Sequence, residues 1–69
     1  MKLKKVFRMI DHVSNVTIMD YDPKLEEYRP VGYVKAGNSR MFSKKMMNRK
    51  VYCIGSDEQD MNGLCIYLD

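Results

Sequence analysis

The chain has 69 residues, of which 45% are apolar and 30% are charged, and its formal net charge at pH 7 is +3. A chain of this size buries only about 60% of its unfolded surface, so we expect one domain over residues 1–69, with little material for a deep catalytic cleft. The composition excludes a disordered chain, and the lack of a long uncharged apolar run excludes a membrane-spanning helix.

The first half of the chain contains one helical pattern and two strand patterns. Apolar residues at helical spacing predict an amphipathic helix over residues 2–11, whose buried face consists of Leu3, Val6, Phe7 and Ile10. The alternating, β-branched segment from Val16 to Tyr21 predicts a strand, and Asp22-Pro23-Lys24 predicts a turn. A second strand is expected from Tyr28 to Lys35, where Pro30 restricts it to a sheet edge or to the strand's first residues.

The next segment predicts a loop and a short helix. Ala36 to Ser39 has loop composition, and Ser39 is a good N-cap for a helix from Arg40 to Asn48. Phe42 and Met46 share one face of this helix, which is therefore the face expected to pack on the core.

The last segment predicts a β-hairpin. Val51–Ile54 and Leu64–Leu68 are apolar strand patterns joined by a polar connection, and Asn62-Gly63 is a turn signal. A register with Ile54 opposite Leu64 and Cys53 opposite Cys65 follows if Gly55 faces Gly63. That register predicts a core face made of Tyr52, Ile54, Leu64, Ile66 and Leu68.

The order of elements is thus α-β-β-α-β-β. It predicts an α+β fold with a four-stranded, mostly antiparallel sheet and two short helices on one face.

Three patterns resemble metal or catalytic sites but lack essential groups. Residues 58–69 imitate an EF-hand calcium loop, yet the first ligand is Glu58 and the twelfth is the short Asp69 instead of a bidentate Glu. His12 with Cys53 and Cys65 would give three ligands without a C-x-x-C knuckle, and no third residue orients a Cys-His nucleophilic pair. Phosphate-binding glycine motifs are absent. We therefore expect no metal, no cofactor and no enzymatic activity.

The two cysteines also bear on the compartment. They are too few for a disulfide framework, and both lie in apolar runs where a thiol packs as a small hydrophobe. Because the basic N-terminal segment also lacks the apolar stretch of a secretory signal, the sequence predicts a reducing, cytoplasmic location.

Charge is segregated along the chain. Residues 1–19 have a net charge of +3, residues 20–30 of −2, residues 31–50 of +6 and residues 51–69 of −4. The basic clusters fall on the two predicted helical segments, which favours a partner of complementary charge. The predicted partner-binding residues are Lys4, Lys5, Arg8, Arg40, Lys44, Lys45, Arg49 and Lys50. An acidic protein is the expected partner, and the alternative is a nucleic acid whose bases would stack on Tyr33 or Tyr67.

The element order also carries a family resemblance. Met1 to Phe7 is a basic helical start, Asn15 to Asp20 an early strand, and Asn48 to Ile54 a segment that leads to a terminal apolar strand. In these features the chain resembles short open reading frames common in phages and integrated elements of Gram-positive bacteria. The resemblance implies a mobile-element accessory protein, a group in which members of known role often bind a host or defence protein, as anti-CRISPR inhibitors do. It assigns no functional residue.

These observations together predict a non-enzymatic protein-binding module that inhibits or modulates a host or defence protein. Nucleic-acid binding through the basic helices is the second hypothesis.

Overall fold

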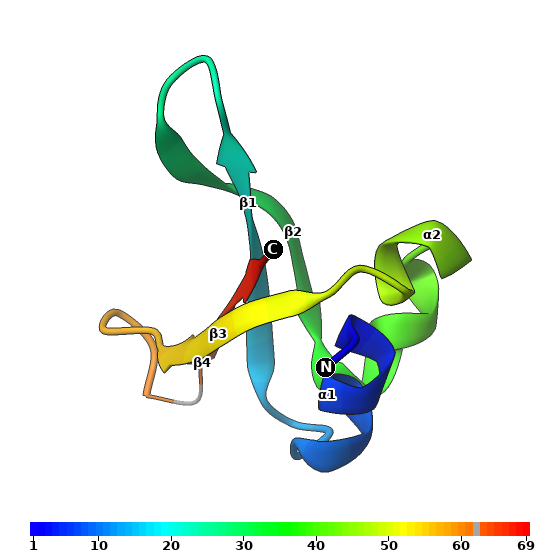
Figure 1. Ribbon diagram of the computed structural model, residues 1–69. Coiled ribbons are helices and arrows are strands. Elements are labelled where there is room, and N and C mark those ends of the chain that lie inside the picture. Colours follow the sequence, from blue (N-terminus) through cyan, green and yellow to red (C-terminus); the bar gives the residue numbers. More distant parts are fainter. Residues whose placement is uncertain (62) are drawn as a thin grey trace.

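The protein is a four-stranded sheet with its helices on one side. The computed structural model describes residues 1–61 and 63–69. Its elements are α1 (Leu3–Met9), β1 (Asn15–Asp22), β2 (Glu27–Lys35), the 3₁₀ helix η1 (Ala36–Met41), α2 (Lys44–Met47), β3 (Val51–Ser56) and β4 (Gly63–Leu68). Figure 1 shows α1, η1 and α2 grouped on one side of the strands. The predicted α+β fold and its element order are confirmed.

The sheet is mixed, with strand order β2-β1-β4-β3. The two outer pairs, β1 with β2 and β3 with β4, are antiparallel, whereas the central strands β1 and β4 run parallel. Strand β2 lies at an edge of the sheet. This is a position that Pro30 allows, because proline has no N–H to donate to a neighbouring strand. The β1–β2 register shifts beside this proline, where Ile18 is opposite Gly32 but Met19 is opposite Pro30.

The core lies between the two central strands and the helices. One side of each amphipathic element supplies it, and the buried residues are Leu3, Val6, Phe7, Val16, Ile18, Val34, Ala36, Ile66 and Leu68. Phe42 packs on this cluster with its ring centre 6.0 Å from that of Phe7. A Cβ at Gly32 would lie 2.8 Å from the Phe42 ring, so glycine is what lets this aromatic ring approach β2.

The predicted second helix is wrong in its start and length. Residues 36–41 form the 3₁₀ helix η1, Phe42 is extended, and only Lys44–Met47 is α-helical. The N-cap is Ser43, whose Oγ accepts a hydrogen bond from the Met46 N–H at 3.1 Å, and not Ser39. The extended backbone at residue 42 lets Phe42 pack on the core, so tertiary packing overrides the continuous helix that local propensity favoured.

The predicted β3–β4 register is also wrong, by two residues. Ile54 is opposite Ile66, Cys53 opposite Tyr67 and Gly55 opposite Cys65, with an irregularity between Val51 and Cys53. A two-residue shift keeps each side chain on its face, so Ile66 and Leu68 are buried as predicted. The irregularity moves Tyr52 off the core face, where Val51 packs instead, and leaves Tyr52 68% exposed.

Ile54 differs from the prediction for another reason. It shares the core face with Ile66 but is 43% exposed. In Figure 1 the end of β3 that leads into the β3–β4 loop extends away from the helices, so no helix covers this part of the sheet.

Candidate partner-binding surface

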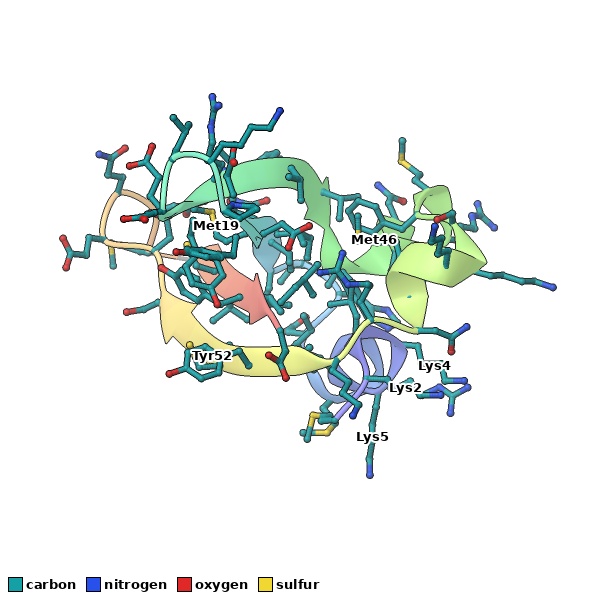
Figure 2. All side chains as sticks on the ribbon, turned by 45° about the horizontal axis from the view of Figure 1, so that its top comes forward. Lys2, Lys4, Lys5, Met19, Met46 and Tyr52 are labelled. Carbon is teal, nitrogen blue, oxygen red and sulfur yellow. The ribbon has the colours of Figure 1, made fainter. Side chains whose placement is uncertain are left out.

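Helix α1 separates apolar and basic side chains. Leu3, Val6 and Phe7 are buried, so Lys4, Lys5 and Arg8 are left on the outer side, where all three are exposed. Figure 2 shows Lys2, Lys4 and Lys5 extending away from the strands. The segregation is a direct consequence of helical spacing in a seven-residue element.

The segment around α2 continues this basic surface. The backbone joins the two regions, because the Leu3 N–H donates to the Arg49 carbonyl at 2.9 Å and the Val51 N–H donates to the Met1 carbonyl at 2.8 Å. Lys2 forms an antiparallel bridge with Lys50. The cations Arg40, Lys44, Lys45 and Lys50 are exposed, and the helices η1 and α2 both contact α1.

Arg49 is engaged inside the molecule. Its guanidinium donates two hydrogen bonds to Asp20, at 3.2 and 3.0 Å, and a third, at 3.3 Å, to the Asp69 carbonyl. Hydrogen bonding to Arg49 holds the pKa of Asp20 below its ordinary value, although partial burial opposes this, and the same pair raises the pKa of Arg49. Arg49 therefore ties the segment after α2 to β1, and this role differs from the partner binding predicted for it.

The two layers of the molecule have opposite charge. Residues 1–14 and 36–50, which we call the helical layer, hold nine Lys or Arg and one acid, a net charge of +8. Residues 15–35 and 51–69, the strand layer, hold three Lys or Arg and eight acids, a net charge of −5. The linear charge segregation of the sequence thus becomes a separation in space.

Exposed methionines lie among the cations of the helical layer. Met1, Met9 and Met41 are all more than half exposed, and Met46 is partly buried. Ser43, Lys45, Met46 and Arg49 line a shallow hollow of about 150 Å³. A basic surface with flexible apolar side chains can contact an acidic protein surface through both charge and packing.

The tyrosines lie elsewhere. Tyr33 is opposite Thr17 and alternates with Val34 and Gly32, which face the helices, so Tyr33 points to the uncovered side of the sheet. Tyr67 alternates in the same way with the buried Ile66 and Leu68. The structure therefore places both proposed stacking residues on the side away from the predicted basic cluster.

Sequence reasoning missed two parts of this surface. Lys2 belongs to it, and the bridge to Lys50 that fixes its place joins residues far apart in the chain. The contribution of Met9 and Met41 was also missed, because a methionine in an amphipathic segment reads as a core residue unless the packing is known.

The residues considered for metal or catalytic chemistry are not assembled into a site. His12 lies beside Gly37 in the connection after α1, whereas Cys53 is exposed on β3 and Cys65 is half-buried on β4. The two thiols are free, and the expectation that both pack in an apolar environment is wrong for Cys53 because the strand register exposes it. Burial, with a smaller effect of the nearby Asp57 carboxylate, raises the pKa of Cys65. Within residues 1–61 and 63–69, no group of three or more His, Cys, Asp or Glu residues could hold a metal ion.

The segment that imitates a calcium loop is built differently from one. The Asp60 carboxylate accepts a hydrogen bond from the side-chain Nδ2 of Asn15 at 2.8 Å, and Gly63–Leu68 is strand β4. A Cβ at Gly63 would lie 2.8 Å from that of Asp57 and 2.9 Å from that of Asp60, so the loop closes tightly around this glycine. Asn62, half of the predicted turn signal, lies outside the described residues.

Among the residues described, no helix is long and apolar enough to cross a membrane. No protein-family model matches the chain. Comparison with curated proteins and with solved structures likewise finds no significant match.

Proposed function

We propose that the protein is a non-enzymatic protein-binding module whose helical layer docks on an acidic surface of its partner. The observation that carries this proposal is the concentration of nine cations and one acid in that layer. Apart from Arg49, which Asp20 engages, these cations are exposed. Charge of this density steers an acidic partner towards the layer and increases the association rate.

The accompanying side chains favour protein over nucleic acid. Single-stranded nucleic acids are held by cations together with aromatic rings on which bases stack. In the helical layer Phe7 is buried and Phe42 packs on the core, so the exposed large apolar groups beside the cations are Met1, Met9, Met41 and Val13. Methionine suits an irregular protein surface, because its flexible thioether adapts to the shape of the partner.

The resemblance to mobile-element reading frames supports a role for this binding. A module of this kind acts as an inhibitor or modulator by covering an acidic surface that a host or defence protein uses for another contact.

A charge-reversal experiment tests the proposal. Lys4→Glu, Lys44→Glu and Lys45→Glu together change the net charge from +3 to −3 without altering the Asp20–Arg49 pair. The control Lys24→Glu, Arg29→Glu and Lys35→Glu makes the same change of net charge in the strand layer. Binding of an amphipathic peptide of Glu and Leu, and of duplex and single-stranded DNA, is measured by fluorescence anisotropy at two salt concentrations. Circular dichroism melting verifies that each variant is folded.

We expect the helical-layer variant to bind the acidic peptide at least about tenfold more weakly, and the control variant to bind it within about threefold of the unmodified protein. Tighter binding of DNA than of the peptide, with a steep salt dependence that the helical-layer variant loses, would contradict the proposal and favour nucleic-acid binding.

A further inference from the structure

Four of the five tyrosines lie on the face of the sheet that no helix covers, and the fifth, Tyr52, lies at the irregularity in β3 near Tyr28. Strand alternation places Tyr33 there opposite Thr17, and Tyr21 opposite Tyr28 two pairs beyond Met19. Tyr67 is opposite Cys53 on the same face, and Tyr52 adjoins Cys53 at the irregularity in β3. Figure 2 shows Met19 and Tyr52 among the strands, well away from Lys4 and Lys5. We call this surface the tyrosine face.

Its central ring is fixed and its outer rings are open. Tyr28 lies between two others, with ring centres 5.1 Å from Tyr67 in an edge-on arrangement and 5.5 Å from Tyr21, and its hydroxyl donates to the Leu68 carbonyl at 3.3 Å. Burial raises the pKa of Tyr28, and the nearby Tyr52 and Cys53 add to the effect. Tyr33 and Tyr52, by contrast, are 67% and 68% exposed, so their ring faces are accessible to a ligand.

The surroundings of this face are acidic. Glu26 lies in the β1–β2 turn and Asp57, Glu58 and Asp60 lie in the β3–β4 loop. Asp69, which follows β4, is close enough to Tyr28 to help raise its pKa. The strand layer has three cations: Lys24 in the β1–β2 turn, Arg29 opposite Asp20, and Lys35, which is on the same face as Tyr33. The net charge of the layer is nevertheless −5. An occupant of the tyrosine face must therefore tolerate, or use, a negative field.

This charge discriminates between the occupants that an aromatic sheet face suits. A nucleic acid would bring phosphates to a layer of net charge −5. A second copy packed face to face would place two such layers against each other. A cationic protein segment meets opposite charge, and a guanidinium stacks on a tyrosine ring while donating hydrogen bonds to carboxylates.

We propose that the tyrosine face binds an arginine-containing basic segment of a protein partner. This surface is separate from the helical layer and goes beyond the proposed function, which does not depend on it. The module would then contact acidic and basic surfaces on its two opposite sides, as a bridging protein does.

The test uses a short oligo-arginine peptide as the probe, with oligo-lysine of equal length for comparison. Affinities are measured by NMR titration of the full chain and of three double variants. Tyr33→Ser with Tyr52→Ser removes the two open rings, and Tyr33→Phe with Tyr52→Phe keeps rings that a cation can contact. Met9→Ser with Met41→Ser makes an equally exposed apolar change in the helical layer.

We expect oligo-arginine to bind several-fold more tightly than oligo-lysine and to shift the amides of the strands. The serine variant should lose about fivefold or more in affinity, since each exposed cation–π contact contributes roughly 0.5–1 kcal/mol, whereas the phenylalanine and methionine variants should retain it. Equal binding of the two peptides without sensitivity to the tyrosines would overturn the proposal, because it would indicate charge attraction alone. Self-association through this face, or preferential binding of single-stranded DNA there, would overturn it too.

Discussion

Gly32 is a point of close packing in the core. A Cβ there would come within 2.8 Å of Phe42, whose ring cannot easily withdraw because it packs on Phe7. We therefore expect Gly32→Ala to lower the free energy of unfolding by about 1–3 kcal/mol, as overpacking does. Urea denaturation of both proteins measures this difference in the free energy of unfolding.

Gly55→Ala is the matched control, because its Cβ would lie 3.9 Å from Tyr67, an ordinary van der Waals contact. It should change the stability by less than about 0.5 kcal/mol. Equal losses for the two substitutions would show that Phe42 is not wedged against β2.

The Asp20–Arg49 pair makes a second prediction at this scale. Because the folded-state pKa of Asp20 lies below its ordinary value of 3.8, the pair stabilises the fold above that pH and loses its contribution as pH falls through the lowered pKa. Asp20→Asn should thus cost about 1 kcal/mol or less near neutral pH, since the pair is about one-third exposed, and the difference from the unmodified protein should shrink below about pH 4.

Denaturant midpoints of both proteins across this pH range test the prediction, with Asp22→Asn as a carboxylate outside the ion pair. A difference that stays constant down to the lowest pH would contradict the role assigned to Arg49.

At the scale of elements, helical cover distinguishes two isoleucines that are paired across β3 and β4. Ile66 is fully buried, whereas Ile54, directly opposite on the same face, is 43% exposed. Ile66→Ala should therefore destabilise the protein by about 2–5 kcal/mol and Ile54→Ala by less than about 1 kcal/mol. Thermal or urea unfolding of both variants distinguishes them, and a larger loss at Ile54 would mean that the helices cover the other end of the sheet.

The same elements show which features of the fold could be predicted from the sequence. Periodicity predicted α1, all four strands and the buried side of β4, because each pattern is local and strong. It did not predict the irregularity at Tyr52 or the break at Phe42. Both depend on contacts between distant segments: the pairing with β4 and the space left by Gly32. The parallel pairing of β1 with β4 is equally nonlocal.

At the scale of the whole molecule, the main feature is a helical layer of net charge +8 on a strand layer of net charge −5. Most of the basic surface was predictable, since a short helix with one buried face must direct its lysines and arginines outwards. The exception is Arg49, whose partner Asp20 lies 29 residues away in the chain. The tyrosine face was not predictable as a unit, because it needs the register of all four strands.

The central claim is that these two layers are separate binding surfaces of opposite preference. Amide NMR tests it most directly, with the Glu–Leu peptide and the oligo-arginine peptide titrated into separate samples of the unmodified protein. The acidic peptide should shift amides of α1 and α2, and oligo-arginine those of the four strands. Shifts of the same amides by both peptides, or of strand amides by the acidic one, would contradict the claim.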